Sequence, residues 1–179
     1  MLKLVIVGMV SLLLSTATSI GELPFPHHHS LSTQTYEKLP DYYKVQVDCL
    51  ATNIYFEANN QSEKGQIAVG LVTMNRLADK DFPKSVCAVV KQQRAHVCQF
   101  SWWCNSKLKA QAIANRFRGA DKEVFDNYRA LATWIFLYYH KIEDVTYGAT
   151  FYHATYVKPQ WRNVEKTVDI EDHVFYRKN

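Results

Sequence analysis

The chain has 179 residues, of which 47% are apolar and 21% are charged. These fractions are close to the average of globular proteins, and they exclude a collagen, a coiled coil and a largely disordered chain. The formal net charge is +4, and the basic residues do not form runs, so the sequence predicts no nucleic-acid partner. The length corresponds to one domain, or to one domain with a short appendage.

The N-terminal segment has the features of a secretory signal peptide. Lys3 is its early positive charge, the apolar run Leu4–Leu14 follows, and small residues occupy positions 15–19. As a helix rising about 1.5 Å per residue, this run is too short for a hydrocarbon layer about 30 Å thick. We therefore predict a cleaved signal peptide over residues 1–19 and no stable membrane anchor afterwards. A retained anchor is the alternative.

A linker and a single domain are predicted after this segment. Residues 20–41 contain prolines, histidines, serines and threonines, which is typical of a connecting stretch. The domain is predicted over residues 42–179, without internal repeats and without a second apolar run of membrane-spanning length.

Export would place the cysteines in an oxidising compartment, where an even number is typical of disulfides. The chain has four: Cys49, Cys87, Cys98 and Cys104. Three connectivities are possible. Cys98 and Cys104 are close enough in sequence to close a short loop, which would leave Cys49 to pair with Cys87. Because no Cys-x-x-Cys pair is present, zinc is disfavoured, and we predict no metal and no cofactor.

The first predicted helix begins near residue 42 and has a charged residue on its apolar face. That face carries, at spacings of three, four and three residues, Val47, Leu50, Ile54 and Glu57. A carboxyl group at the end of such a stripe loses hydration, so the pKa of Glu57 is expected to rise. A protonated carboxyl group is the general acid that glycosidic cleavage requires, because the departing alkoxide must be protonated. The alternative is a glutamate that reaches solvent or pairs with an arginine.

A second helix is predicted to begin after a cap at Ser62 and to end near residue 78. Its apolar face is formed by Ile67, Leu71, Met74 and Ala78. Gly65 and Gly70 lower the helix propensity but permit close approach of a neighbouring helix.

Further helices are predicted along the chain. Pro83 is expected in the first turn of a short helix that carries Val86, Val89 and Val90. Residues 93–105 are predicted as a loop and residues 107–117 as another helix. A long helix is expected over residues 121–142, with one face formed by Val124, Tyr128, Leu131, Ile135, Tyr138 and Ile142.

The C-terminal part has a strand pattern instead. Residues 150–153 are β-prone, and residues 164–170 and 173–177 alternate in polarity on either side of Glu171-Asp172, which predicts a hairpin. The predicted fold class is α+β, mostly helical with a small antiparallel sheet near the C-terminus.

Other catalytic patterns are missing from the sequence. It contains no Gly-x-Ser-x-Gly elbow and no His-Glu-x-x-His helix, and six glycines leave little scope for a phosphate-binding loop. A free cysteine nucleophile is disfavoured by export. The spacing of four histidines predicts no metal site: His96, His140, His153 and His173.

A family resemblance is carried by six stretches in order: Cys49–Ala58, Gly65–Val69 with Asn75-Arg76, Phe82–Val90, Cys98–Cys104, Phe151–Trp161 and His173–Tyr176. Together they resemble the SleB-type cell wall hydrolases, the family named for the spore cortex-lytic enzyme, over residues 47–177. The resemblance implies a lysozyme-like, lytic-transglycosylase-like fold that acts on the glycan strands of peptidoglycan. It also implies that Glu57 is the catalytic acid, in agreement with its place on the apolar stripe.

The sequence departs from the family pattern at two places. The family usually continues from Glu-Ala with Arg-Gly-Glu, whereas this chain has Asn59-Asn60-Gln61. After the last cysteine the family often has Asp-Gly, whereas this chain has Asn105-Ser106. These changes are expected to affect the rate and the substrate preference of the enzyme. They leave the expected general acid, the glutamate, in place.

The resemblance also suggests substrate-binding residues, which lie in two of the matching stretches: Gln99, Phe100, Ser101, Trp102, Tyr152 and His153. The polar members are expected to hydrogen-bond the sugar or its N-acetyl groups, and the alternative for each residue is a structural role in holding the loop in place. The rings of Phe100 and Trp102 are expected to form a stacking surface. His153 is expected to orient Glu57 or to line the cleft.

The favoured mechanism is that of a lytic transglycosylase, which needs one carboxyl group because the muramic acid supplies its own C6 hydroxyl as nucleophile. A hydrolysing glycosidase normally needs a second carboxylate, about 5–5.5 Å away for retention or about 6.5–9.5 Å away for inversion. Three acidic residues of the late sheet remain candidates for that second group: Asp169, Glu171 and Asp172.

Other functions remain open. A muramidase would hydrolyse the glycan, and an N-acetylmuramoyl-L-alanine amidase would release the stem peptide. A non-catalytic peptidoglycan-binding module is suggested by the altered segment 59–61. For each of these we expect a monomer that is secreted or periplasmic, in the cell envelope. A phage-encoded lysis protein would have the same features.

Overall fold

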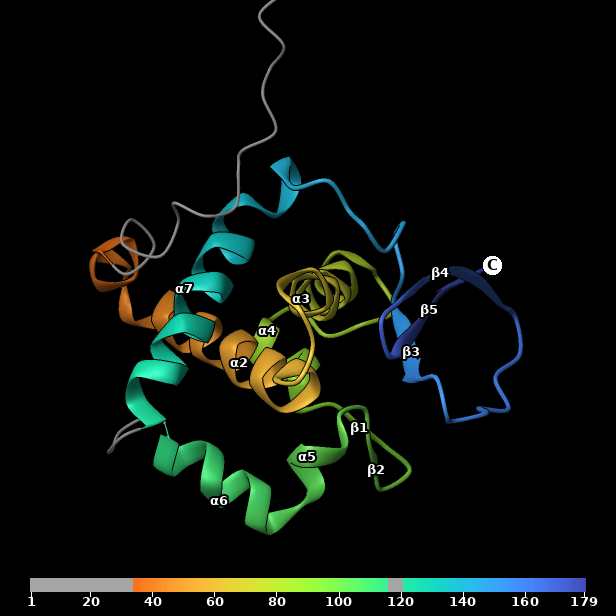
Figure 1. The fold of residues 1–179 in the computed structure, drawn as a ribbon, viewed down its shortest axis with the longest axis horizontal. Coiled ribbons are helices and arrows are strands. Elements are labelled where there is room, and N and C mark those ends of the chain that lie inside the picture. The colour runs from red at the N-terminus through yellow and green to blue at the C-terminus, as the bar shows by residue number, and fades with distance from the viewer. Residues whose placement is uncertain (1–33, 116–120) are drawn as a thin grey trace, which may run out of the picture.

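The computed structural model describes residues 34–115 and 121–179 (Figure 1). The predicted signal peptide, residues 1–19, and most of the predicted linker, residues 20–41, lie outside these residues, so both stay predictions. Within the described ranges, no helix combines the length and the apolar content that crossing a membrane requires.

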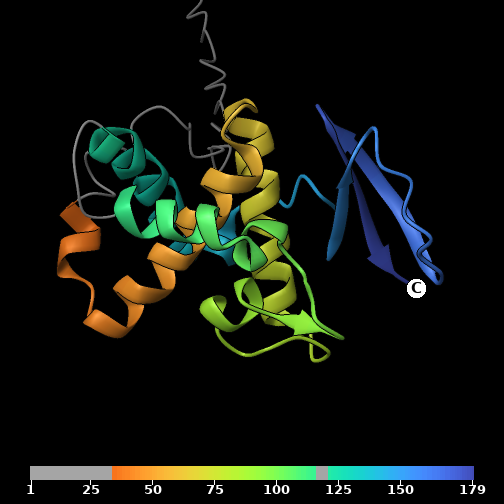
Figure 2. The same cartoon turned by 90° about the horizontal axis from the view of Figure 1, so that it is seen from below.

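The chain folds into a helical body with a small sheet at one end (Figures 1 and 2). The helices are α2 (Asp41–Ala58), α3 (Glu63–Ala78), α4 (Val86–Val90), α5 (Ser101–Cys104), α6 (Ser106–Asn115) and α7 (Asp121–Tyr138), followed by a 3-10 turn over Tyr139–Lys141. Strands β1 (Gln93–Arg94) and β2 (Val97–Cys98) form a short hairpin. The sheet is formed by β3 (Phe151–Ala154), β4 (Val164–Ile170) and β5 (His173–Lys178). The α+β prediction is confirmed.

Helix α2 lies at the centre of the helical body, where α3, α4 and α7 pack against it. Its predicted apolar stripe is confirmed, because Val47, Leu50 and Ile54 are fully buried. Gly70 of α3 permits the close approach expected of it. A Cβ atom there would lie 2.6 Å from Ile135 Cδ1 of α7 and 3.2 Å from Ile54 Cδ1. Three helices therefore meet at this glycine.

The sheet packs on the other side of α3. Strand β5 is central and antiparallel to both β3 and β4, and the β4–β5 hairpin confirms the predicted one. Ala68 and Val72 of α3 form a second small core with Ile170 and Phe175 of the sheet. Helix α3 therefore contributes to two cores, one toward the helices and one toward the sheet.

Two local predictions are wrong. Pro83 lies before the third helix instead of in its first turn, because α4 begins at Val86 and the Ser85 Oγ caps it by accepting the Ala88 N–H at 3.2 Å. Residues 93–105 are not one loop, since they contain β1, β2 and α5. Strands of two residues are too short to produce a recognisable alternation.

The buried face of α7 agrees with the prediction in part, because Ile135 is buried and Tyr128, Leu131 and Ile142 pack against the main core. Val124 and Tyr138 are exposed, whereas Phe125, Trp134 and Ile135 are buried. Apolar residues occur around most of this helix, so its spacing is compatible with more than one face. Packing against α2 selects the face that contains Phe125 and Ile135.

Both disulfides follow the favoured pairing. Cys49 is bonded to Cys87, which joins α2 to α4. Cys98 is bonded to Cys104, which joins β2 to α5. The first bond fixes a helix of the central core, and the second closes the short stretch that carries the predicted substrate-binding loop. Cross-links of this kind stabilise a fold mainly by restricting the unfolded chain.

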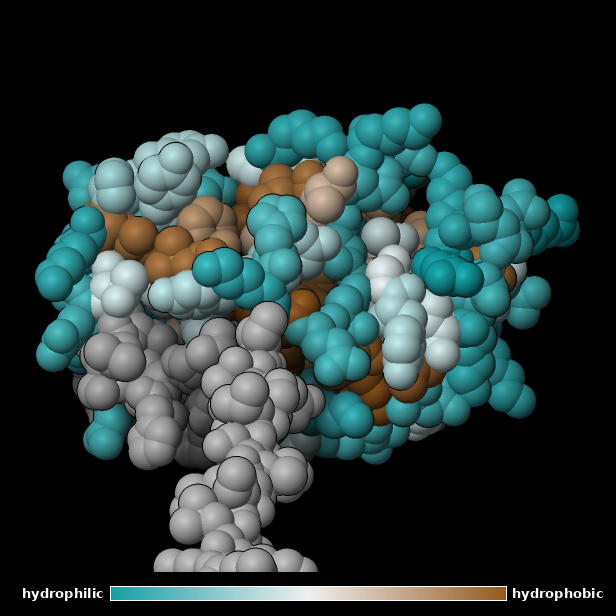
Figure 3. Space-filling view, turned by 90° about the horizontal axis from the view of Figure 1, so that it is seen from above, coloured by the Kyte–Doolittle hydropathy of each residue, from teal (hydrophilic) through white to brown (hydrophobic). Residues whose placement is uncertain are grey.

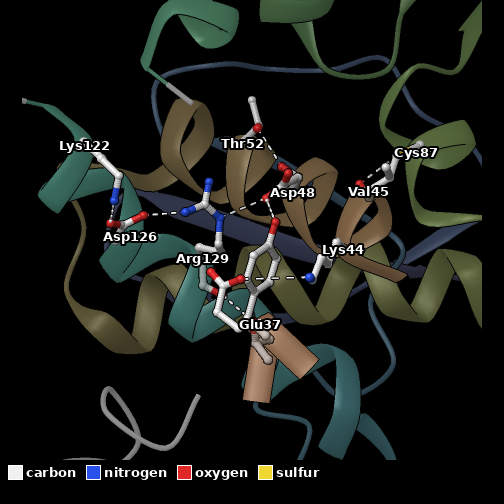
Figure 4. Close-up of polar contacts among 11 residues, drawn as sticks. Glu37, Lys44, Val45, Asp48, Thr52, Cys87, Lys122, Asp126 and Arg129 are labelled. Atoms are coloured by element: carbon white, nitrogen blue, oxygen red, sulfur yellow. Dashed lines mark hydrogen bonds and ion pairs between the residues drawn. The ribbon is translucent and has the colours of Figure 1, made fainter. Parts of the chain in front are cut away.

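An ion-pair network fastens α7 to α2 (Figure 4). The Arg129 Nε donates to Asp48 Oδ1 at 3.0 Å, and Arg129 also pairs with Asp126 on its own helix. The Tyr36 hydroxyl donates to the same oxygen of Asp48 at 3.1 Å. Because the pair is largely buried, the loss of either partner would leave a charge without compensation.

The two ends of the molecule differ in surface character on the face drawn in Figure 3. Hydrophobic residues show between hydrophilic ones over the helical body, whereas hydrophilic residues predominate over the end that carries the sheet. Scattered apolar residues are normal on a protein surface.

Replacement of Gly70 by alanine tests the three-helix contact. We expect Gly70→Ala to lower the free energy of unfolding by about 1–2 kcal/mol, because overpacking outweighs the better helix propensity of alanine. Ile135→Val removes the Cδ1 atom that the new methyl group would meet. In urea unfolding, the double variant should therefore lose less stability than the sum of the two single variants. Additive losses would show that Ile135 does not limit the space at Gly70.

Candidate active site

Glu57 lies in the last turn of α2, where it continues the line of the buried stripe. Its side chain is partly buried, and the Tyr152 hydroxyl of β3 donates a hydrogen bond to Glu57 Oε2 at 2.9 Å. The contact joins two segments that are 95 residues apart in the sequence. The structure thus places Tyr152, which was predicted to bind the sugar, directly on the candidate acid.

Burial raises the pKa of the Glu57 carboxyl, and this is the largest effect on it. The hydrogen bond from Tyr152 and the positive charge of Arg76 act in the opposite direction, because both favour the carboxylate. The direction of the pKa agrees with the one expected from the apolar stripe. Burial also holds the pKa of Tyr152 well above its usual value, so its hydroxyl stays a donor at neutral pH.

Arg76 of α3 is the site residue that sequence reasoning missed. Its side chain is 4% exposed, and its Nε donates to the Thr150 carbonyl at 2.6 Å. Burial lowers its pKa to about 10, while the neighbouring Tyr152 and Glu57 act to raise it. The guanidinium group is therefore still charged at neutral pH. The missed signal is the spacing of Val69, Val72 and Arg76, which sets a charged residue at the end of an apolar stripe as in α2.

Aromatic rings enclose the arginine. The guanidinium carbon of Arg76 lies 4.9 Å from the centroid of Phe100, 5.5 Å from that of Phe82 and 5.9 Å from that of Phe151. A cation desolvated between aromatic faces is stabilised by their quadrupoles. Within the described residues, Arg76 Nη1 is buried without a hydrogen-bond partner. A buried polar group without a hydrogen-bond partner is costly, and such groups are rare in folded proteins. Its presence here indicates that Arg76 has a role besides packing.

Phe100 and Trp102 do not form the stacking surface that was predicted. Phe100 is 2% exposed and Trp102 is 4% exposed, and both belong to the main core. The Trp102 Nε1 donates to Asn53 Oδ1 at 3.0 Å, and its ring stacks on Phe56 at 4.9 Å between centroids. These rings therefore form the wall behind the site, and Phe100 packs on Arg76 and Tyr152.

Gln99 and Ser101 lie on either side of Phe100 in the same segment. Gln99 is partly buried, and its backbone N–H donates to the Gln92 carbonyl at 3.0 Å, while Ser101 is exposed. No contact described here connects either side chain with Glu57. Their role in binding sugar stays a prediction.

His153 lies on the opposite face of β3 from Tyr152, because neighbouring residues of a strand point to opposite sides. Its ring stacks on Tyr176 at 5.4 Å between centroids, and its Nε2 lies 3.1 Å from the Tyr176 hydroxyl. Tyr152, by contrast, contacts Glu57 and Phe175. The expectation that His153 orients Glu57 is therefore wrong.

The three acidic residues of the late sheet have structural partners. Glu171 accepts hydrogen bonds from the Ser62 backbone N–H at 2.9 Å and from the Ser62 hydroxyl, at the N-terminus of α3. A carboxylate at this position is favoured by the helix dipole. Asp169 pairs with Lys166 at 2.6 Å. Asp172 is held by the segment that departs from the family pattern.

That segment contacts the hairpin through Gln61. The Gln61 Nε2 donates to Asp172 Oδ2 at 3.0 Å, and the Asp172 backbone N–H donates to Gln61 Oε1 at 3.3 Å. The glutamate that the family usually has at this position would set a like charge against Asp172. The change to glutamine therefore has a structural reason in this chain.

No metal centre is evident in the part of the chain that the structure describes, where no group of three or more histidine, cysteine, aspartate or glutamate side chains could hold an ion. Within the same residues, the groups that influence the pKa of Glu57 are Tyr152 and Arg76, and no carboxylate is among them. The arrangement can donate a proton from Glu57 and can then stabilise the carboxylate that remains.

Tyr152→Phe tests the hydrogen bond to Glu57. The variant loses a donor to the carboxylate, so the pKa of Glu57 should rise further above its usual value. The measurement is an NMR titration of the Glu57 carboxyl carbon. Tyr176→Phe is the matched control, because Tyr176 lies on the opposite face of the sheet and should leave this titration unchanged. An unshifted pKa in Tyr152→Phe would contradict the contact.

Glu57→Gln should keep the fold and become more stable relative to the wild type as the pH rises. The folded state resists ionisation of Glu57, so the wild type loses stability once the pH passes the pKa that Glu57 has in the unfolded chain. The loss grows until the pH exceeds the raised pKa of the folded state. In urea unfolding from pH 4 to pH 7.5, the free energy of unfolding of the variant should rise relative to that of the wild type as the pH increases. The opposite trend would mean that the fold favours the carboxylate.

Comparison with known proteins agrees with the sequence resemblance. The family described as Cell Wall Hydrolase matches residues 60–176, which include Arg76, the 98–104 segment and Tyr152. The match begins three residues after Glu57 and so does not itself cover the candidate acid. Searches of curated proteins and of solved structures found no match. Since the family match covers more than half of the sequence, the chain belongs to the SleB-type cell wall hydrolases.

Proposed function

We propose that this cell wall hydrolase cleaves the glycan strands of peptidoglycan as a lytic transglycosylase, with Glu57 as its one acid and base. Membership of the family implies peptidoglycan as the substrate. The observation that carries the finer proposal is the environment of Glu57. Burial raises the pKa of its carboxyl group, and the Tyr152 hydroxyl donates a hydrogen bond that holds this group in place.

In the first step, Glu57 gives its proton to the oxygen between N-acetylmuramic acid and N-acetylglucosamine. The bond from the muramyl C1 to this oxygen breaks, and the N-acetylglucosamine end leaves as an alcohol. A raised pKa favours this step, because the acid must be protonated near neutral pH. The Tyr152 hydroxyl donates to Oε2, so we assign the proton transfer to Oε1.

In the second step, the Glu57 carboxylate removes the proton of the muramyl C6 hydroxyl, whose oxygen bonds to C1 and closes a 1,6-anhydro ring. The proton returns Glu57 to its starting state, and no water is consumed. The hydrogen bond of Tyr152 and the charge of Arg76 both stabilise the carboxylate that exists between the steps. Burial and these two groups therefore favour opposite forms of the same side chain.

The late-sheet acids, which were the candidates for a second carboxylate, have partners of their own in the fold. A hydrolase normally needs a second carboxylate facing the first across the sugar. Asp169, Glu171 and Asp172 each take part in a contact with the protein itself, as described above. A muramidase, an amidase and a non-catalytic binding module are the alternatives.

An extracytoplasmic location is part of the proposal. Two disulfides are typical of proteins that work in an oxidising compartment, where peptidoglycan is also found. The signal peptide over residues 1–19, the domain over residues 42–179 and the monomeric state belong to the same proposal.

Product analysis tests the mechanism. Purified wild type should release fragments with anhydro-muramyl ends from peptidoglycan, as identified by mass spectrometry. Glu57→Gln should lower the rate by about 10²–10⁴-fold, because it loses the general acid while it keeps the fold. Reducing sugar ends would mean hydrolysis and a second carboxylate. Free stem peptides that persist in Glu57→Gln and disappear with a chelator would identify an amidase instead.

A further inference from the structure

We propose that the face of the sheet that points away from Glu57 carries a second, non-catalytic binding site for an N-acetylated amino sugar of the glycan strand. The structure has a hollow of about 410 Å³ there, next to β3 and β5. It is lined by His153, Thr155, Val157, Lys158, Pro159, Trp161, Val164 and Tyr176. The identity of the ligand rests on the proposed function, whereas the site itself is separate from Glu57.

Aromatic rings give the hollow a fixed apolar surface. Trp161 is 41% exposed, yet its ring is held at 5.6 Å from His153 and at 5.7 Å from Tyr176, between centroids. The planes of Trp161 and Tyr176 are nearly perpendicular, at 83°. A ring that is exposed but already held in place loses little freedom on binding. Its face suits the C–H side of a pyranose ring, which is the apolar part of a sugar.

Polar groups surround this surface. The Tyr176 hydroxyl and His153 Nε2 lie 3.1 Å apart and form a hydrogen-bonding pair at the edge of the rings. Thr155 and Lys158 add a hydroxyl and an ammonium group from the exposed segment that follows β3. A few polar groups beside an apolar surface are typical of small-ligand sites, in which they fix the orientation of the ligand. Sugar hydroxyls and the N-acetyl group offer the matching donors and acceptors.

The charge of the segment suits a muramyl residue. Residues 153–163 contain two cations, Lys158 and Arg162, and no carboxylate. The lactyl group of muramic acid and the stem peptide attached to it bring carboxyl groups to the glycan strand. Complementary charges raise the rate of encounter and the specificity more than they raise affinity. The hollow therefore combines an aromatic surface with one lining cation, Lys158, which suits the carboxyl groups of peptidoglycan.

The hollow and Glu57 lie on the two faces of β3, although the Trp161 ring also contacts Phe151, which packs on Arg76. Strand β3 carries Tyr152 on the side of Glu57 and His153 on the side of the hollow. One strand of the sheet thus takes part in both sites from its two faces. A sugar in the hollow would belong to another stretch of the glycan, or to a neighbouring strand, and would keep the enzyme on its insoluble substrate between cuts.

The test measures binding in the Glu57→Gln background, in which the glycan should not be consumed. The probes are purified peptidoglycan sacculi in a pelleting assay and a soluble tetramer of N-acetylglucosamine in a calorimetric titration. Adding Trp161→Ala should raise both dissociation constants by about fivefold or more. Tyr42→Ala is the matched control, because it removes an aromatic ring that is 60% exposed at the start of α2, and it should change neither constant.

Two more variants keep the test decisive. Lys158→Glu should weaken binding to sacculi more strongly than binding to the neutral tetramer, because only the sacculi carry carboxylates. Tyr176→Phe removes one hydroxyl without removing a ring, so it should still weaken binding of the tetramer if Trp161→Ala fails to fold. Circular dichroism and thermal unfolding report the fold of each variant.

The outcomes distinguish this inference from the proposed function. Equal binding by the Trp161→Ala and Tyr42→Ala variants would overturn the inference, even if the wild type releases anhydro-muramyl products. Binding to sacculi that salt abolishes and that Trp161→Ala leaves unchanged would also overturn it, since charge alone would then explain the binding. If the wild type has no cleavage activity but its binding depends on Trp161, the result would support a sugar-binding site in the hollow and contradict the proposed function.

Discussion

The burial of one carboxyl group, that of Glu57, is the constraint on which the rest of the site depends. Burial favours the protonated form, whereas the hydrogen bond from Tyr152 and the charge of Arg76 favour the ionised form. A group that must first give and then take a proton needs both forms to be accessible near the working pH. Arg76, which belongs to the helical body, and Tyr152, which belongs to the sheet, both act on Glu57, so the site lies where these two parts meet.

This arrangement is costly for the fold. Arg76 and the polar groups around it are removed from water, and an incompletely paired buried cation opposes folding. The surrounding structure compensates with close packing at Gly70, with the Cys49–Cys87 bond and with the Asp48–Arg129 pair. These features lie in the helical body, away from the sheet. The stability of that body therefore supports a site that is itself unfavourable.

Periodicity explains how much of this could be predicted from the sequence. The stripe on α2 predicted both the burial of Glu57 and the direction of its pKa, and the alternation around Glu171-Asp172 predicted the hairpin. Spacing could not show whether Trp102 faces the core or a cleft, because an aromatic residue suits either place. The contact of Tyr152 with Glu57 depends on the tertiary structure, since the two residues are 95 positions apart. Arg76 could have been found by the reasoning that found Glu57.

The contact between Gln61 and Asp172 has a further consequence for how the enzyme meets its substrate. Together with the bonds from Ser62 to Glu171, it ties the loop between α2 and α3 to the turn of the hairpin. The helix that carries Glu57 and the sheet that carries Tyr152 are thus joined at a second place besides the site itself. Under the proposed function, a glycan strand would meet a site whose two halves are already joined, so its binding energy would not be used to bring them together.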